Sequence, residues 1–297
     1  SYFQLISNRM LLEPPVVEAA NLAWADETVQ PVLTYLANWT SNGDQKIPYS
    51  TITAVDSMPQ LGPLLDSSRT PIELRDDEIV INEWAASQQD LAAKLGDEIE
   101  VKYFDAETTH GEATESAATF RLEAIAPLGG NGQPLTAAND RALTPQLAGV
   151  TDQDSLDDWE PPFPYDSSRN RPRDEQYWNR YRTTPKSFIS LSAGRKLWES
   201  RFGDTTSMRI LPTETNSIEQ LAAELESAIQ PDQLGFSFLP VKRLGLQASS
   251  GTTPFDALFL GFSMFLIAAA LMLVSLLFRL GVEQRADELG LMSAVGF

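Results

Sequence analysis

The pattern of hydrophobic and polar positions divides the chain into a long mixed part and one short, almost wholly apolar part. The apolar run begins at Ala257, ends at Phe278 and reads ALFLGFSMFLIAAALMLVSLLF, without a charged residue. At about 1.5 Å rise per residue, a helix over this run reaches roughly 30 Å, the thickness of the hydrocarbon core of a bilayer. The core helix of a soluble protein is usually shorter and keeps a polar face. The pattern therefore predicts a transmembrane helix at 255–280.

Residues 1–254 carry the shorter periods that are typical of a folded domain with both helices and strands. Ser217 and Gln220 form a capping-box pattern ahead of an apolar stripe at helical spacing, which consists of Ile218, Leu221, Leu225 and Ile229. Stretches rich in Val, Ile, Thr and aromatic residues predict strands. The predicted helices are 16–24, 83–95, the second half of 186–203, and 217–230; the predicted strands are 32–37, 46–56, 78–81, 99–103, 118–128, the first half of 186–203, and 234–245.

The clearest local unit lies at 78–104, where a short strand is followed by Asn82, a residue suited to cap a helix. The apolar residues that follow recur on one helical face, and Gly96 is placed to end the helix. Alternating apolar residues then predict a second strand. We interpret the stretch as a βαβ-like element in a mixed sheet. Its apolar positions are Trp84, Leu91 and Leu95 in the helix and Ile99, Val101 and Tyr103 in the second strand.

Regular periodicity disappears over 129–185, where Pro, Asp and Asn dominate. A loop region of this length inside a compact domain is normally functional or lacks a fixed structure, and it is open whether it forms an inserted subdomain. The predicted fold class is therefore an α+β domain, with a mixed sheet, helices and a loop-rich insert at 129–185, followed by one transmembrane α-helix. Because the chain begins without methionine or an export signal, we expect it to start within a longer protein.

Charge is concentrated in the long mixed part. The tail after Phe278 contains Arg279 and Arg285 against Glu283, Asp287 and Glu288, so it carries −1, and the residues before it carry −18 of the total of −19. An acidic domain repels the phosphate backbone of nucleic acids, and we expect no nucleic-acid partner.

Familiar catalytic patterns are absent from the sequence. Cysteine does not occur, His110 is the single histidine, and no Walker phosphate-binding loop is found. We therefore predict no catalytic residue, no metal site and no bound cofactor, and we expect any ATP to be bound by a separate polypeptide. An enzyme remains the third hypothesis, because paired carboxylates leave no clear sequence pattern.

Two charged stretches within 129–185 could carry a site. The acidic loop 152–166 offers aspartate oxygens to calcium but lacks the glycine and glutamate of an EF-hand loop, so calcium binding stays open. We expect Trp159 and Phe163 to anchor this loop. The next stretch interleaves arginines with aromatic residues, and we expect it to form ion pairs with the preceding aspartates or to contact a partner protein. Its arginines are Arg169, Arg171, Arg173, Arg180 and Arg182, and its aromatic residues are Tyr177, Trp178 and Tyr181.

Two weaker patterns complete the sequence. Asn38-Trp39-Thr40 fits the acceptor pattern for N-glycosylation. Basic residues flank both ends of the apolar run, Lys242 and Arg243 before it and Arg279 and Arg285 after it, so that the positive-inside rule only slightly favours a cytoplasmic C-terminus.

The stretch VEQRADELGLMSAVGF at the end of the chain resembles the motif that follows the second membrane helix of the FtsX-like permeases, which are membrane subunits of ABC transporters and include the macrolide exporters. The family pattern reads R-x-E-I-G-x-x-[KR]-A-[IVL]-G-[AF]. Asp287 is an insertion relative to it, and Ser293 stands where a basic residue is usual. The matching residues are Arg285, Glu288, Leu289, Gly290, Ala294, Val295, Gly296 and Phe297. Less specifically, 79–101 and 159–186 are similar to parts of the family's extracytoplasmic domain.

The resemblance implies an organisation and a set of partners. Residues 1–254 would lie outside a bacterial cytoplasmic membrane, 255–280 would cross it, and 281–297 would contact an ABC ATPase in the cytoplasm. The implied ATPase-contact residues are Arg285, Glu288, Leu289, Gly290, Ala294 and Gly296. Other implied partners are membrane lipid, a second permease copy or paralogue, and a periplasmic adaptor. The implied role is export or release of a lipid, lipoprotein, peptide or drug.

A receptor or sensor with one membrane span is the alternative hypothesis. Its outer domain would bind a ligand, and its inner end would lead into a signalling module.

Overall fold

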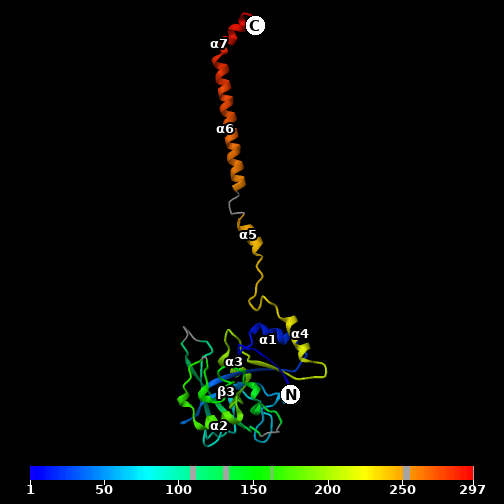
Figure 1. Ribbon diagram of the computed structural model, residues 1–297, viewed down its shortest axis with the longest axis vertical. Helices are drawn as coiled ribbons and strands as arrows, with labels where there is room; N and C mark the ends of the chain where they lie inside the picture. Colours follow the sequence, from blue (N-terminus) through cyan, green and yellow to red (C-terminus); the bar gives the residue numbers. More distant parts are fainter. Residues whose placement is uncertain (108–111, 130–133, 162, 250–254, 297) are drawn as a thin grey trace. The chain divides into compact units, whose positions relative to one another are not determined.

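The computed structural model describes residues 1–107, 112–129, 134–161, 163–249 and 255–296. Contacts divide the chain into two compact units, which we call the globular unit, residues 1–235, and the C-terminal unit, residues 236–297 (Figure 1). Residues 236–249, which the sequence assigns to the first domain, lie in the second of these units.

The described part of the globular unit contains a mixed sheet of eight strands in the order β1-β8-β2-β3-β7-β4-β6-β5. Strand β2 pairs with β3 on one side and with β5 on the other, so the pairings β2–β3–β7–β4–β6–β5–β2 form a closed ring. Strands β8 and β1 extend from the N-terminal part of β2. The strands are β1 (Phe3–Ile6), β2 (Val29–Asn42), β3 (Gln45–Ala54), β4 (Glu78–Asn82), β5 (Glu98–Phe104), β6 (Glu115–Ala126), β7 (Ser187–Ile189) and β8 (Ser207–Ile210).

The main core forms because alternating residues of the ring strands point to one side. In β5, Ile99, Val101 and Tyr103 are buried while their neighbours are more exposed, as the period of two predicts. Leu33 and Ile81 contribute fully buried side chains from β2 and β4 to the same cluster. The predicted α+β class, with a mixed sheet and helices, is confirmed.

The predicted helix at 83–95 is wrong. Asn82 accepts a hydrogen bond from the backbone of Ala85 at 2.9 Å, as a cap does, but the chain continues through successive turns, and Ala92 has a left-handed φ of 47°. Asp90 is fully buried in these turns and bound by two arginines from a distant segment. These long-range ion pairs outweigh the local helical pattern, which is a weak preference by comparison.

The predicted βαβ-like element is also wrong, because β4 and β5 are not neighbours. Strand β6 lies between them, parallel to β4 and antiparallel to β5. The strand predicted at 234–245 is replaced by helix α5 (Val241–Ser249), preceded by turns and irregular chain. A helix satisfies its backbone hydrogen bonds within its own segment, whereas a strand needs a partner strand. Strands β1 and β8 and helix α2 (Pro172–Tyr181) were not predicted.

Three further helices cover parts of the sheet. Helix α3 (Leu191–Trp198) contacts β2 and β3, while α1 (Pro14–Ala23) and α4 (Ile218–Ala228) pack against each other (Figure 1). Leu221 and Leu225 of the predicted stripe are buried with Trp24, and Ser217 accepts a hydrogen bond from the backbone of Gln220. Ile218 is 62% exposed, so the buried stripe is shorter than predicted.

The insert, residues 129–185, belongs to the same compact unit as the sheet. It contains α2 and several single 3₁₀ turns: η2 (Ala137–Asn139), η3 (Arg141–Leu143), η4 (Leu156–Asp158) and η5 (Ser167–Arg169). Apolar side chains of the insert, among them Val150, Leu156 and Trp178, pack on Tyr49 of β3. They form a small cluster that is separate from the main core. Trp159 is 8% exposed in this cluster and anchors the insert, as predicted.

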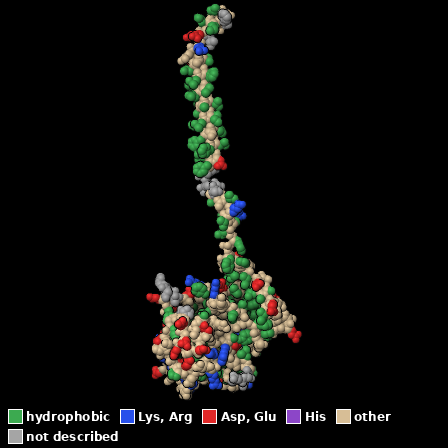
Figure 2. All heavy atoms as spheres, in the orientation of Figure 1, with side chains coloured by type: hydrophobic (Ala, Val, Ile, Leu, Met, Phe, Trp, Pro, Cys, Tyr) green, Lys and Arg blue, Asp and Glu red, His purple; other side chains and the backbone are tan. Residues whose placement is uncertain are grey.

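The described part of the C-terminal unit is mainly helical. Helix α5 is followed by α6 (Phe255–Gln284), which begins and ends close to the predicted span, and by α7 (Ala286–Ala294). Hydrophobic side chains cover the surface of α6 (Figure 2). They are exposed, including Phe278, which is 74% exposed.

Candidate functional site

Helix α6 is the first candidate, and it has the properties of a membrane span. Between Asp256 and Arg279 it contains no charged residue, and its 30 residues reach about 45 Å. Among the described residues it is the only helix long and apolar enough to cross a membrane. None of its side chains is buried within the described chain, unlike those of the core helix of a soluble protein. Ala257 and Phe278 both lie within it.

The charged end of α6 extends beyond the apolar run. Arg279 and Glu283 lie one turn apart and form an ion pair of 3.1 Å between exposed side chains. The positive-inside rule counts lysines and arginines and gives acidic residues little weight, so this pair leaves the orientation as weakly determined as the sequence indicates.

The predicted contact residues surround the short helix α7. Arg285 stands at the break between α6 and α7, and Glu288 lies in the first turn of α7, where a negative charge is favoured by the helix dipole. Gly296 follows the helix with a φ of 96° and donates its N–H to Ser293, so it ends the helix as a left-handed glycine does. Ala294 is the last helical residue.

Gly290 lies in the middle of α7, and apart from its chain neighbours and the nearby backbone of its own helix, no described atom lies within 4 Å of the position that a Cβ would take. A glycine inside a helix costs roughly 1 kcal/mol relative to alanine. Packing within the described chain gives no reason for it. The structure brings the six predicted contact positions together on one short segment but does not test what they bind.

A cavity between the sheet and the insert is the second candidate. It has a volume of about 330 Å³ and is walled by strands β2 and β3 on one side and by the insert on the other. Its walls are mainly apolar and aromatic. The aromatic residues that line it are Tyr35, Tyr49, Phe104, Trp159, Phe163, Tyr177 and Trp178, and the charged residues are Arg9, Asp174, Arg182 and Lys186.

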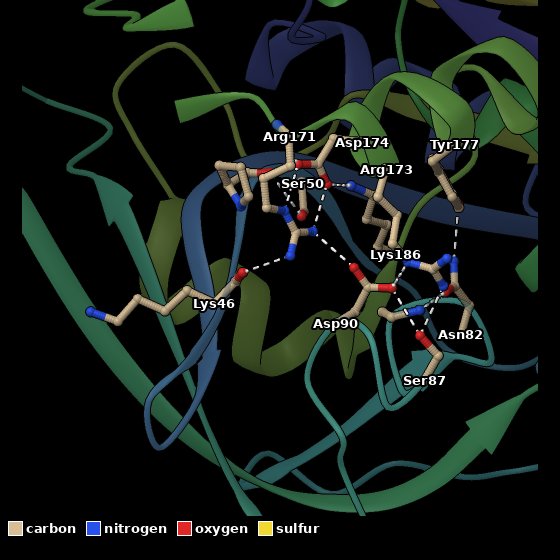
Figure 3. A network of polar contacts seen from close by, with 12 residues as sticks. Lys46, Ser50, Asn82, Ser87, Asp90, Arg171, Arg173, Asp174, Tyr177 and Lys186 are labelled. Carbon is tan, nitrogen blue, oxygen red and sulfur yellow. Dashed lines mark hydrogen bonds and ion pairs between the residues drawn. The ribbon is translucent and has the colours of Figure 1, made fainter. Parts of the chain in front are cut away.

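A buried network of charges lies next to this cavity (Figure 3). Asp174 at the start of α2 accepts hydrogen bonds from the backbone N–H of Arg171 and from its guanidinium, the latter at 2.8 Å. The same guanidinium donates to Asp90 at 2.8 Å. Arg173 pairs with the other oxygen of Asp90 and donates to Ser87 at 2.9 Å. Arg171 therefore joins two carboxylates from distant segments, and Arg173 binds one of them.

Lys186 completes the network on the side of the cavity. Its side chain is only 6% exposed, and its Nζ lies 3.7 Å from Asp174, which is longer than a hydrogen bond. The ammonium also lies over the rings of Trp84 and Tyr177, at 4.9 and 4.8 Å from their centres. Tyr177 itself is held by Asn82, which donates to its hydroxyl at 2.9 Å.

Burial and neighbouring charges act in opposite directions on the pKa values of Lys186 and Asp174. Burial lowers the pKa of Lys186 to about 8, although the charge of Asp174 acts to raise it. Burial acts to raise the pKa of Asp174, but hydrogen bonds from Arg171 and the charge of Lys186 hold that pKa below its ordinary value. Burial also raises the pKa of Tyr177, so this hydroxyl stays neutral.

The structure places the charged stretches of the insert only partly as the sequence predicts. Of the predicted ion pairs to preceding aspartates, Arg182–Asp154 and Arg169–Asp166 are formed. Arg171 and Arg173 instead pair with Asp90, far earlier in the chain. In the part of the chain that the structure describes, no three His, Asp or Glu side chains are grouped so as to hold a metal ion.

The glycosylation pattern is buried. Asn38 lies in β2 with 1% exposure and donates to Glu115 at 2.9 Å, so it is not accessible to a modifying enzyme. His110 lies outside the described residues.

The cavity and the buried network were missed from the sequence. Asp90 and Lys186 sit in stretches that read as a helix and as a strand, with no local sign of a site. The interleaved arginines and aromatic residues of 169–182 were the available signal, since α2 supplies both kinds of side chain to the cavity and the network.

Comparisons with known proteins give structural likenesses only. No family model and no curated protein matches this sequence. The periplasmic region of MacB from Actinobacillus actinomycetemcomitans has a TM-score of 0.38 and 10% identity, over 82% of this chain and 86% of that one. The extracellular domain of the noncanonic ABC-type transporter YknZ from Gram-positive bacteria has a TM-score of 0.38 and 9% identity, over 80% and 94%.

A domain of a putative permease protein from Porphyromonas gingivalis has a TM-score of 0.32 and 10% identity, over 70% of this chain and 69% of that one. Identities and TM-scores this low establish neither the family nor the function of this chain.

Proposed function

We propose that this chain is a membrane subunit of an ABC transporter of the FtsX-like type. The globular unit lies outside the cytoplasmic membrane, α6 crosses it, and α7 contacts an ATPase that is a separate polypeptide. ATP-driven changes in that partner reach the globular unit through α6 and promote export or release of a lipid, lipoprotein, peptide or drug.

The observation that carries this proposal is the joining of three elements in one chain. An acidic globular unit is followed by an exposed apolar helix of membrane length and then by a short helix whose sequence resembles the family motif. Exposed apolar surface of this extent is stable only when lipid or protein covers it. A helix that continues past the apolar run to Gln284 can transmit movement to α7.

The open surroundings of Gly290 support the role of α7 in binding. A glycine that costs helix stability and has no packing role within the described chain lets a partner backbone approach closely. Glu288 and Arg285 are exposed next to it and offer both charges to the same partner.

The topology can be tested with single cysteines, since the native chain contains none. Ala222→Cys lies on the exposed face of α4, and Ser293→Cys lies on α7. A membrane-impermeant maleimide applied to intact spheroplasts should label the first variant, and label the second only after lysis. Labelling of both from the same side would contradict the proposal.

The ATPase contact can be tested by affinity purification from membranes of the native host, with mass spectrometry to detect a Walker-motif ATPase. The double variant Leu289→Glu/Gly290→Glu should capture about tenfold less ATPase, a change of about 1.4 kcal/mol in binding. Leu291→Glu/Met292→Glu adds the same charge to the same helix at the two positions that the motif leaves unspecified, and is the matched control. Equal capture by both variants would contradict the contact.

A receptor with one membrane span is the second candidate, and the cavity of about 330 Å³ is the observation that favours it. Such a receptor would have a kinase or coiled-coil partner in the cytoplasm in place of an ATPase. The same affinity purification separates the two functions, because it identifies which class of protein is captured.

A further inference from the structure

We propose that the cavity between the sheet and the insert binds a small amphipathic anion, with an aromatic body among the aromatic walls and one carboxylate or sulfonate group near Lys186. The inference concerns the globular unit alone. It holds or fails independently of whether α6 and α7 belong to a transporter.

The size and walls of the cavity fit an aromatic body. Its volume of about 330 Å³ lies at the lower end of the roughly 300–1,000 Å³ that is usual for small-molecule sites. Trp159 and Trp178 meet at 76° with ring centres 5.2 Å apart, and Tyr49 also lines the space. Rings held in such edge-to-face arrangements favour a further ring by about 0.5–1.5 kcal/mol beyond the area buried.

The charge of the cavity is opposite to that of the chain. Three cations, Arg9, Arg182 and Lys186, line it, with Asp174 as the single carboxylate among the lining residues that the structure describes. The chain as a whole carries −19. Arg9 and Arg182 are paired with exposed carboxylates at the rim, so the buried ammonium of Lys186 is the charge that favours an anion over a cation inside the cavity.

Lys186 has hydrogen-bonding capacity left for the anionic group. The carboxylate of Asp174 is bound by Arg171 at 2.8 Å on both oxygens, whereas Lys186 is 3.7 Å away from it. An ammonium has three N–H donors. Including Arg173 and Asp90, the buried network contains three cations and two carboxylates, so one positive charge is in excess.

Two buried polar atoms on the cavity walls lack a partner within the described chain. They are Oδ1 of Asn38 and Nε1 of Trp159, in side chains that are 1% and 8% exposed. A buried polar atom without a hydrogen bond costs about 1–3 kcal/mol. One atom is an acceptor and the other a donor, so a ligand that carries a hydroxyl or amide group in addition to its anionic group would satisfy them.

Calorimetric titration of the full chain in lipid nanodiscs tests the proposal, with empty nanodiscs as the reference. The probes are naphthalene-2-sulfonate and 2-naphthylmethylammonium, which share a ring system and differ in charge. We expect the sulfonate to bind at least about tenfold more tightly than the ammonium compound. Binding of the sulfonate that does not exceed the empty-disc signal would overturn the proposal, as would tighter binding of the cation.

Variants locate the binding. Lys186→Met keeps an unbranched side chain but removes the charge, and we expect about a tenfold loss of sulfonate affinity. Lys196→Met is the control, because that lysine is 68% exposed on α3 and does not line the cavity. Leu147→Trp fills the cavity from the insert without changing charge and should abolish binding. If Lys186→Met does not fold, unchanged binding by Leu147→Trp still overturns the proposal.

A pH titration separates a binding role of Lys186 from a packing role. The groups that face it are Asp174 and Arg171 from α2 and its cap, Asp90 from the turns after β4, and Tyr177. Since the pKa of Lys186 lies near 8, sulfonate affinity should fall between pH 7 and pH 9 in the native chain. Constant affinity over this range would overturn the role of the lysine.

Discussion

Two buried charge centres in the globular unit differ in how completely their charges are balanced. In the first, Arg209 and Asp140 form a one-to-one pair of 2.8 Å, and Arg209 is fully buried. Tyr2 donates to the same carboxylate at 2.8 Å, and Gln30 accepts from the guanidinium at 3.0 Å. The second centre, around Asp90 and Asp174, has an additional cation and borders a cavity.

The difference indicates which centre serves the fold and which is suited to a ligand. A balanced pair away from the cavity gains nothing from an added ion, so its role is to join β8 to the insert. A buried cation without a full counter-charge lowers stability, and such a cost is typical of binding sites. The additional cation of the second centre is Lys186, and the first centre has no residue that corresponds to it.

The largest expected effect is on the balanced pair. Arg209→Met should lower the free energy of unfolding by about 3–5 kcal/mol, because it leaves Asp140 charged and buried without its partner. All six tryptophans lie in the globular unit, so urea unfolding followed by tryptophan fluorescence reports this unit. Arg9→Met removes an exposed ion pair and is the control. Equal midpoints for the two variants would show that the pair is not structural.

A smaller decrease in the free energy of unfolding is expected when the second centre loses a carboxylate. Asp90→Asn should cost about 2–3 kcal/mol, since it removes the charge that Arg171 and Arg173 share. Both arginines are about one-quarter to one-third exposed and can regain water, unlike Arg209. The same fluorescence measurement applies. A loss greater than that of Arg209→Met would reverse the order of the two centres.

The excess cation should reveal itself in the pH dependence of stability. The pKa of Lys186 is about 8 in the folded chain against an ordinary value of 10.5. The unfolded chain therefore binds more protons between these values, and the free energy of unfolding should rise with pH there, by on the order of 2 kcal/mol up to pH 10. Lys186→Met should lack this rise.

Measurements for this comparison must stay below about pH 10. The pKa of Tyr35 is raised to about 12, mainly by burial, so the unfolded chain loses that proton first and stability falls again at higher pH. A rise that is identical in the native chain and in Lys186→Met would assign it to another group.

The smallest effect is expected at the exposed rim of the cavity. Asp154→Asn breaks the 3.2 Å pair with Arg182, but the Asp154 side chain is 98% exposed. Exposed pairs contribute little, and the free energy of unfolding should change by less than about 0.5 kcal/mol. A loss above about 1 kcal/mol would show that this pair holds the insert in place.

Local patterns predicted the strands well where one face is buried. The alternation in 99–103 and the β-rich stretch 32–37 lie within strands of the sheet, and the stretches 46–56 and 118–128 each run two residues past the end of a strand. The order of the strands was not predictable from them, because β6 inserts between β4 and β5 through contacts that only the folded sheet provides.

The buried charge network could be predicted from local patterns even less than the order of the strands. Asp90 and Lys186 are separated by almost one hundred residues, and they are linked through Arg171 and Asp174, which come from a third segment. No spacing along the chain encodes such a meeting. The amphipathic pattern around Asp90 even indicated a helix, because single-segment patterns cannot register the ion pairs that hold the turns.

The sequence alone determined the apolar helix and its length. It also determined the acidic character of the residues before this helix and the motif after it, since each of these features depends only on residues that are neighbours in the chain. The closed ring of strands, the cavity beneath the insert and the unbalanced charge beside it follow only from the folded structure. They arise where segments far apart in the sequence exclude water together, and burial then sets both the pairing of charges and the pKa of Lys186.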